Sequence, residues 1–156
     1  MNEWPFARHK WPGIGDNEGP LAFTSTREGG VSQGCYASLN VGRHVGDEED
    51  AVTENRARLL AATGVDAARL ALCSQTHSTA VAPVAVGGGA LDPSSRAPAA
   101  DGLVTNTSGL AVGVMTADCA PVLVWAEEHR AVAAIHAGRV GVYDGIVASG
   151  MKVMSR

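Results

Sequence analysis

A series of short apolar runs, each bounded by turn residues, is the feature that most constrains the fold of this chain of 156 residues. Val and Ile recur in the runs, which are typical of short, largely buried strands. The runs cover residues 70–74, 79–86, 101–105, 110–116, 121–126 and 131–136. Three of them end at, or shortly before, a residue that can bind a metal: His77, Cys119 and His136. Because strand ends can converge on one point, the sequence predicts that these three side chains lie together.

One thiol and two imidazoles form a ligand set that suits zinc with an open fourth position, as in catalytic zinc sites. The other interpretation is that His77 and His136 are core histidines with satisfied hydrogen bonds, and that Cys119 is a small buried apolar residue. Spacing alone supports the two interpretations equally. Cys35 and Cys73 are not among these three candidate ligands, and we interpret both as structural.

Composition argues against several classes of protein. The apolar fraction of 46% is enough for one buried core. A net charge of −4 argues against a nucleic-acid partner and against an anionic membrane surface, since both attract basic patches. No window holds the ~18 apolar residues that a membrane span needs. Three cysteines and no visible signal peptide favour reduced thiols and a cytoplasmic location.

The N-terminal part of the chain is predicted to contain little regular structure. Residues 1–20 are rich in Pro, Gly and charge, and we expect an extended surface segment there. A single domain is expected over residues 21–156. It begins with a strand at residues 21–26, and residues 27–40 are predicted to form a structured, glycine-containing loop.

Two helices are predicted. Asp47 is the expected N-cap of the first, and Gly64 is its expected end. The second begins near Val142. Residues 87–100, which lie between two predicted strands, are expected to form a flexible loop. The second helix carries an apolar stripe with no later segment to pack against it, so we expect a C-terminally truncated chain; the stripe consists of Ile146, Val147, Met151 and Met154.

Several motifs occur together in an order and spacing that resemble one family. They are Thr24-Ser25-Thr26-Arg27, Gly29-Gly30-Val31-Ser32, Tyr36-Ala37-Ser38-Leu39-Asn40, Gly46-Asp47, Asn55-Arg56, Gln75-Thr76-His77, Ala100-Asp101-Gly102-Leu103-Val104-Thr105, Thr116-Ala117-Asp118-Cys119-Ala120-Pro121 and His136-Ala137-Gly138. From about Leu21 to its end, the chain resembles the YfiH-like laccase-domain family, whose members are also called polyphenol oxidases and purine nucleoside phosphorylases.

The resemblance implies a fold and a cofactor. The fold is of the α/β (α+β) class, a four-layer α/β/β/α sandwich with a mixed sheet, and this chain is expected to lack its last part. The resemblance also implies one zinc ion held by His77, Cys119 and His136, and no organic cofactor.

The resemblance implies nucleoside chemistry as well. The expected activity is phosphorolysis of adenosine, inosine, guanosine or methylthioadenosine, with adenosine deamination as an additional activity. Copper-dependent oxidation of polyphenols is the older attribution. The expected partners are therefore a purine nucleoside and phosphate, in a monomer or weak homodimer. Arg139 and Val140 stand where many members of the family have Trp-Arg, so a pocket wall and a basic group are expected to differ here.

Candidate roles follow for the polar residues of the motifs. Asp118 is interpreted either as the partner that orients a ligand histidine or as a catalytic acid or base, with a turn-forming aspartate as the equally weighted alternative. Arg56 is a candidate phosphate contact, and Arg139 is a second one, because a guanidinium group binds phosphate oxygens in a bidentate way. The alternative for Arg56 is an arginine on a solvated helix face. Ser38 and Asn40 are candidates for hydrogen bonds to the ribose or base, with ordinary turn chemistry as the alternative. Gln75, two residues before a ligand, is a further candidate for a substrate contact.

Other functions remain open from the residues. A multicopper oxidase needs many more histidines than the five present here, whereas a single blue-copper site could use Met115 as its axial ligand. A cysteine amidase acting on a peptidoglycan precursor would use Cys119 as nucleophile, His136 or His77 as base and Asp118 as orienting group. An inactive remnant that associates through its apolar stripe is the non-enzymatic alternative.

Overall fold

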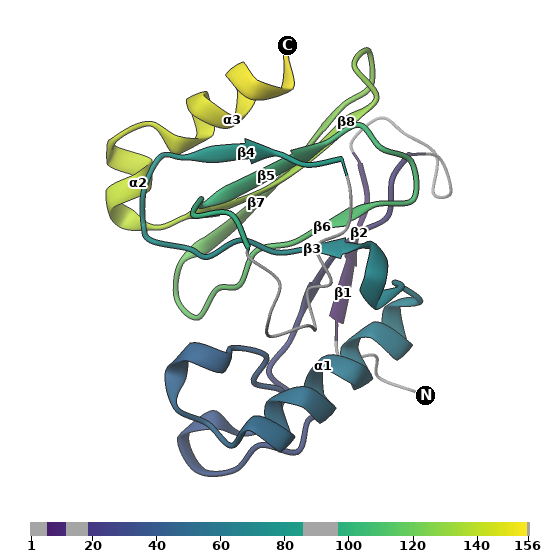
Figure 1. Cartoon of the computed structure of the whole chain (residues 1–156), viewed down its shortest axis with the longest axis vertical. Coiled ribbons are helices and arrows are strands. Elements are labelled where there is room, and N and C mark those ends of the chain that lie inside the picture. The colour runs from purple at the N-terminus through teal and green to yellow at the C-terminus, as the bar shows by residue number, and fades with distance from the viewer. Residues whose placement is uncertain (1–5, 12–18, 86–96, 156) are drawn as a thin grey trace. The chain divides into compact units, whose positions relative to one another are not determined.

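The computed structural model of this protein describes residues 6–11, 19–85 and 97–155 (Figure 1). The chain divides into two compact units, Met1–Val65 and Asp66–Arg156, which we describe in turn. None of the described helices combines the length and apolar character needed to cross a membrane.

The first unit contains a two-stranded antiparallel sheet and one long helix. Strand β1 (Phe6–His9) pairs with β2 (Ala22–Ser25), and the His9 ring bonds Thr24 Oγ1 at 2.8 Å. The strand predicted at residues 21–26 is therefore confirmed as β2. Part of the predicted extended segment, residues 6–9, is paired as β1, while residues 1–5 and 12–18 lie outside the described residues. Two short 3-10 helices follow, η1 (Gly34–Tyr36) and η2 (Arg43–Val45).

Helix α1 (Glu49–Thr63) completes the first unit and begins later than predicted. The prediction that Asp47 is its N-cap is wrong, because Glu48 occupies that position without a side-chain bond. The Asp47 carboxylate instead accepts hydrogen bonds from Ser32 Oγ at 2.6 Å and Asn40 Nδ2 at 2.9 Å, so the preceding loop uses this side chain. The predicted end at Gly64 is confirmed: this residue has a φ of 70°, and its N–H bonds the carbonyl of Leu60.

The second unit is built on a four-stranded mixed sheet. In the order β4-β5-β8-β7, it comprises β4 (Val81–Pro83), β5 (Gly102–Thr105), β8 (Ala131–Ala137) and β7 (Ala120–Ala126). The β4–β5 pair is parallel, and the other two pairs are antiparallel. A separate parallel pair joins β3 (Leu70–Ala71) to β6 (Ala111–Val112), and η3 (Ala67–Arg69) precedes β3.

Each apolar run predicted as a strand contains one, but two of the strands are much shorter than their runs. Strands β3 and β6 hold two residues each, and the rest of the runs 70–74 and 110–116 forms irregular backbone. These irregular stretches lead to His77 and Cys119. The predicted flexible loop at residues 87–100 lies largely outside the described residues; within its described end, Ala99 forms an isolated bridge with Ser74.

Two helices follow the last strand. They are α2 (Arg139–Tyr143) and α3 (Ile146–Met154), and the chain turns between them at Gly145, whose φ is 90°. The predicted helix near Val142 is therefore two helices that start at Arg139. Helix α3 packs on β8, β5 and β4.

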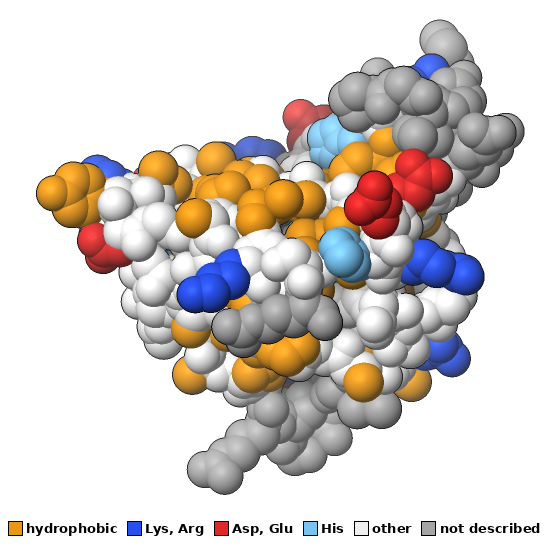
Figure 2. Space-filling model, turned by 90° about the horizontal axis from the view of Figure 1, so that it is seen from above, with side chains coloured by type: hydrophobic (Ala, Val, Ile, Leu, Met, Phe, Trp, Pro, Cys, Tyr) orange, Lys and Arg blue, Asp and Glu red, His pale blue; other side chains and the backbone are white. Residues whose placement is uncertain are grey.

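Half of the apolar stripe packs against strands that precede it in the chain, so it needs no later segment to cover it. Ile146 and Met154 are 0% and 4% exposed, and they belong to a core cluster with Val104, Ala133 and Ile135 of the sheet. The sheet formed by earlier strands supplies the surface. The two helices also carry exposed apolar side chains, which are Val140, Val142, Tyr143, Val147 and Met151. Figure 2 shows one face of the molecule on which hydrophobic side chains gather.

The mixture of sheets with few helices confirms the predicted α+β class. The small side chains of Ala131 and Ala133 on β8 are buried in the cluster that contains Ile146 and Met154, and they let α3 approach the sheet closely. The carboxyl end of β8 carries His136, so this packed sheet sets the position of one predicted metal ligand.

Candidate metal centre

Strand register brings two of the three predicted ligands together. In the antiparallel β7–β8 pair, Ala120 lies opposite Ala137 and Pro121 lies opposite His136. Cys119 directly precedes β7 and therefore reaches the end of β8, next to His136. The third ligand, His77, lies in the turn between β3 and β4.

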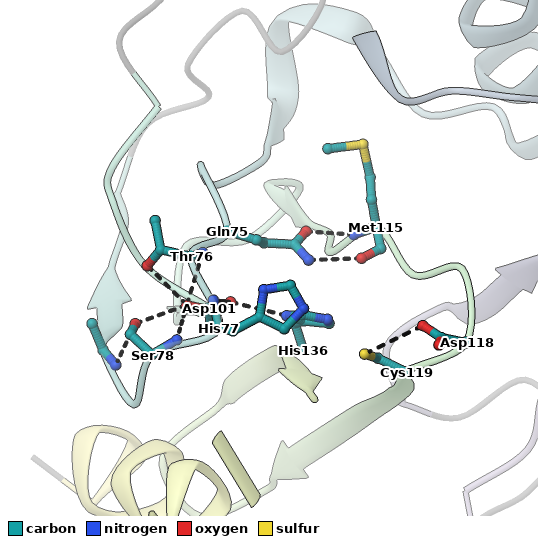
Figure 3. A network of polar contacts seen from close by, with 10 residues as sticks. Gln75, Thr76, His77, Ser78, Asp101, Met115, Asp118, Cys119 and His136 are labelled. Carbon is teal, nitrogen blue, oxygen red and sulfur yellow. Dashed lines mark hydrogen bonds and ion pairs between the residues drawn. The ribbon is translucent and has the colours of Figure 1, made fainter. Parts of the chain in front are cut away.

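The three side chains form a compact cluster, shown in Figure 3. One ligand atom from each of His77, Cys119 and His136 lies within 4.8 Å of the others. The two imidazole rings meet edge to face, with their centroids 4.8 Å apart and an interplanar angle of 79°. His136 is 4% exposed, Cys119 is half-buried and His77 is exposed, so the cluster runs from the core to the surface. The predicted convergence of the three residues is confirmed.

The cluster has room for an ion because residue 138 has no side chain. A Cβ atom at Gly138 would lie 3.0 Å from His77 Cδ2, 3.4 Å from Cys119 Sγ and 3.5 Å from His136 Cε1. In a tetrahedral site, zinc bonds of about 2.0–2.3 Å place two ligand atoms roughly 3.3–3.8 Å apart, so a spread of up to 4.8 Å closes by about 1 Å on binding. The donor set and the space left by Gly138 therefore fit a metal ion.

A buried aspartate lies behind the two histidines. Asp101 directly precedes β5, is 0% exposed, and accepts a hydrogen bond from His136 Nδ1 at 2.9 Å. It also accepts bonds from the backbone N–H groups of Thr76 (3.1 Å), His77 (2.9 Å) and Ser78 (2.7 Å). Burial raises the pKa of a carboxyl group, but here the donated hydrogen bonds outweigh that effect and hold the Asp101 pKa well below its usual range.

The thiol of Cys119 has a different environment. Partial burial raises its pKa, and the neighbouring charge of Asp118 raises the pKa further, while the backbone amide of Arg139 acts in the opposite direction. The Sγ atom lies 3.7 Å from Asp118 Oδ1. A raised pKa keeps the metal-free thiol protonated at neutral pH, so a metal ion that binds here must displace a proton.

The carboxylate that bonds a ligand histidine is that of Asp101, whereas Asp118 was the predicted partner. The carboxylate of Asp118 is exposed and contacts the sulfur, whereas Asp101 bonds the histidine. Asp101 lies within a motif that supported the family resemblance, yet no role followed from it. An aspartate at the first position of an apolar run was the available signal, because a buried carboxylate requires partners.

Gln75 clamps a neighbouring loop. Its Nε2 donates to the carbonyl of Met115 and its Oε1 accepts from the Met115 N–H, both at 2.7 Å. The two bonds tie the turn that holds His77 to the segment that leads to Cys119. Both ends of this amide therefore have backbone partners, and a contact between Gln75 and substrate stays a prediction. Figure 3 shows that the amide of Gln75 faces the Met115 backbone.

Three further candidates, Ser38, Asn40 and Arg56, lie in the first unit. Ser38 Oγ bonds the carbonyl of Arg27 and the N–H of Gly30, and Asn40 bonds Asp47. The polar atoms of Ser38 and Asn40 thus organise their own loop.

The loop is centred on Asn55, a residue to which the sequence assigned no role. Asn55 is 0% exposed, and its Nδ2 donates to Ser32 Oγ and to the carbonyls of Ser38 and Asn40, while its Oδ1 accepts from the Val31 N–H. One buried amide therefore fixes the backbone on which two candidate residues stand.

Arg56 is buried rather than on a solvated helix face. It is 9% exposed, and its Nε donates to the carbonyl of Val41 at 2.7 Å. Burial lowers the pKa of its guanidinium group, and the positive charge of Arg43 lowers it further. Arginine nevertheless stays protonated, so α1 carries a buried positive charge next to a second one. Arg139, by contrast, is exposed at the start of α2.

The other two cysteines differ in their surroundings. Cys73 is 3% exposed, and burial together with the charge of Asp101 raises the pKa of its thiol to about 11, as befits a structural residue. Cys35 is exposed, so it has no part in the core.

Comparisons with solved structures identify the fold. YfiH from Bacillus licheniformis matches with a TM-score of 0.82 and 32% identity, over 87% of this chain and 52% of that one. YlmD from Geobacillus stearothermophilus matches with a TM-score of 0.80 and 34% identity, over 85% of this chain and 50% of that one. The predicted YfiH-like fold is therefore confirmed.

Comparisons of sequence agree. A purine nucleoside phosphorylase of Corynebacterium glutamicum is 44% identical over 124 residues, which are 80% of this chain and 49% of that protein. A purine nucleoside phosphorylase of Haemophilus influenzae is 43% identical over 131 residues, which are 84% of this chain and 50% of that protein. The chain thus spans about half the length of the curated relatives it matches. The sequence profile of a family described as multi-copper polyphenol oxidoreductase laccase matches residues 21–156, and the chain belongs to this family.

Proposed function

We propose that this chain takes part in the phosphorolysis of purine nucleosides, at a zinc centre held by His77, Cys119 and His136. The observation that carries the proposal is the convergence of these three ligands around Gly138, which leaves space for one ion. The relatives named as purine nucleoside phosphorylases support the choice of reaction. Adenosine, inosine, guanosine and methylthioadenosine are the proposed substrates.

Zinc is the metal that we favour. A thiolate with two imidazoles is a common zinc ligand set, and three protein ligands leave a position open. A bound zinc ion would supply a Lewis acid beside the substrate. His77 is the exposed member of the three, so the open side of the centre is expected to face solvent and substrate.

The proposed reaction forms one bond and breaks one. A phosphate oxygen bonds the anomeric carbon of the ribose, and the bond from that carbon to the purine nitrogen breaks, with its electron pair leaving on the base. The products are ribose 1-phosphate and a purine that gains a proton. We assign phosphate binding to Arg139, which lies in the same unit as the three ligands and whose guanidinium group suits phosphate oxygens. A phosphate contact of Arg56 stays a prediction. Asp118, exposed beside Cys119, is the group to which we assign the proton of the departing base.

The other reactions are less well supported by the site. A cysteine amidase needs an activated thiolate, whereas partial burial and Asp118 raise the pKa of the Cys119 thiol. A multicopper oxidase needs several copper ions, and the cluster offers three ligands. Deamination of adenosine remains compatible with one zinc ion, and the assay described next measures it separately.

The test is a phosphate-dependence assay on zinc-loaded protein. Adenosine is supplied with and without phosphate, and adenine, ribose 1-phosphate and ammonia are each measured. Phosphorolysis predicts adenine and ribose 1-phosphate in equal amounts, only when phosphate is present. Formation of ammonia without adenine would indicate deamination instead of phosphorolysis. Formation of adenine in the assay that lacks phosphate would indicate hydrolysis.

A pair of cysteine variants provides the control. Cys119→Ala should lose both zinc, measured by elemental analysis, and phosphorolysis, whereas Cys35→Ala should keep both because that thiol is exposed and outside the cluster. Activity that survives chelation but not thiol alkylation would favour the cysteine amidase. Copper with an intense blue colour in the purified protein would favour the oxidase.

A further inference from the structure

The buried carboxylate of Asp101 contacts both histidines of the cluster in two different ways. Its Oδ1 accepts from His136 Nδ1 at 2.9 Å and from the backbone N–H of His77 at 2.9 Å. Its Oδ2 accepts from the backbone N–H of Thr76 and from both the N–H and the hydroxyl of Ser78. Figure 3 shows that these bonds converge on Asp101 from the turn and from β8. One side chain therefore connects the turn that carries one ligand to the strand that carries the other.

The first contact determines which ring nitrogen of His136 is available. An ionised carboxylate can only accept hydrogen bonds, so Nδ1 must be the nitrogen that carries the proton. Nε2 then keeps its lone pair, which is the state that a metal ligand requires. Because His136 is 4% exposed, water has little access to compete for Nδ1.

The second set of contacts shapes the turn that carries His77. This residue has a φ of 59°, in the left-handed region that costs a non-glycine residue roughly 1–2 kcal/mol. The N–H groups of Thr76, His77 and Ser78 all point at the one carboxylate, an arrangement that binds anions well. The charge of Asp101 thus offsets the strain and holds the turn in the conformation that aims the His77 ring at the cluster.

We infer that Asp101 is a positioning residue that sets both imidazoles of the centre, one through its ring and one through its backbone. The inference rests on the proposed metal centre and adds to it a group that does not contact the metal. It predicts that a change at Asp101 disturbs two ligands at once.

Asparagine is the sharpest substitution, because it keeps the shape of the side chain and replaces one acceptor by a donor. If its oxygen faces Thr76 and Ser78, its amino group faces the ring of His136. Nδ1 of His136 must then accept, and the proton moves to Nε2, where it blocks metal binding. A wrong tautomer of this kind is known to inactivate a catalytic histidine.

The experiment measures zinc affinity and the His136 tautomer together. Zinc affinity is determined by competition with a chromophoric chelator, and the tautomer by ¹⁵N NMR of metal-free protein, in wild type, Asp101→Asn and Asp66→Asn. Asp66 is an exposed aspartate of the same unit whose side chain accepts from the Ala68 N–H, a bond that asparagine can also make. We expect Asp101→Asn to bind zinc about 10–100-fold more weakly and to carry the proton on Nε2, with Asp66→Asn at wild-type values. Wild-type affinity together with a proton on Nδ1 in Asp101→Asn would overturn the inference.

A second variant and the wild type keep the test decisive if Asp101→Asn does not fold. Ser78→Ala removes one hydroxyl that donates to Oδ2 and leaves the bond to His136 in place. It should weaken zinc binding several-fold with the His136 tautomer unchanged, and unaltered zinc binding would overturn the role of the turn. In metal-free wild type, a proton on Nε2 of His136 would overturn the role of the ring contact. If wild type binds no zinc, the proposed function fails, while the wild-type tautomer still tests the orientation of His136.

Discussion

At the scale of single residues, the centre depends on small differences in atom type and volume. His77, Cys119 and His136 provide the donor atoms, but their use depends on groups that contact no metal. Gly138 leaves the space and Asp101 fixes the donors. Gly138 has a φ of −72° and a ψ of 161°, an extended backbone that any residue adopts, so only the missing Cβ explains the glycine.

We therefore predict that Gly138→Ala lowers zinc affinity by at least ~10-fold while the protein remains folded, because the new methyl group contacts all three ligands. Zinc affinity is measured by competition, and folding by circular dichroism. Gly64→Ala is the matched control, for which we expect a loss of stability and an unchanged zinc affinity. Its left-handed φ of 70° should cost about 1 kcal/mol of stability without a change in zinc affinity. Wild-type affinity in Gly138→Ala would show that the cluster opens away from residue 138.

At the scale of elements, the last helix shows how the sheet selects one side of an apolar helix. Periodicity identifies the stripe on α3, but it does not say which members meet the sheet. Ile146 and Met154 point into the core cluster, whereas Val147 and Met151 face outward. Helix α3 thus carries two methionines, of which Met154 is buried and Met151 is exposed.

We expect Met154→Ala to reduce the free energy of unfolding by about 2–5 kcal/mol, because it leaves a cavity under α3. Met151→Ala should change that free energy by less than about 0.5 kcal/mol, since the side chain is 49% exposed. Urea unfolding followed by circular dichroism compares the two variants, and their helix propensities cancel. Equal losses would mean that the outer side of α3 is also buried in solution.

At the scale of the whole molecule, the proposed metal centre belongs to one of the two compact units. All three metal ligands and Asp101 come from the second unit, Asp66–Arg156. A metal ion that binds the native state stabilises the part of the protein that holds it.

Zinc at 100 times its dissociation constant is predicted to stabilise the second unit by about 2.7 kcal/mol. Hydrogen exchange measured with zinc and with a chelator should show slower exchange in the turn at residues 75–78 and in β5 and β8. The amides of α1 should exchange at the same rate in both conditions. Cys119→Ala should show no zinc effect anywhere. Equal protection of α1 and β8 by zinc would show that the two units unfold together.

The sequence by itself determined the local features of this protein. The apolar runs, most of which contain Val or Ile, predicted every described strand of the second unit, since these preferences act within a few residues. The three ligands were also predictable, because donor atoms are a property of residue type. The exact strand lengths were not predictable from the sequence. Strands β3 and β6 are only two residues long, and the irregular segments that follow them are joined by the contact between Gln75 and Met115.

The tertiary structure alone decided which groups support the site. Asp101 meets the ring of a histidine 35 residues away, and Gln75 meets the backbone of a residue 40 positions away. The position of Asp47 predicts a helix cap, yet Ser32 and Asn40 of the preceding loop donate hydrogen bonds to it instead. The physical reason is common to all three: a polar side chain bonds the strongest donors or acceptors within reach, and strand register and loop packing determine which groups those are.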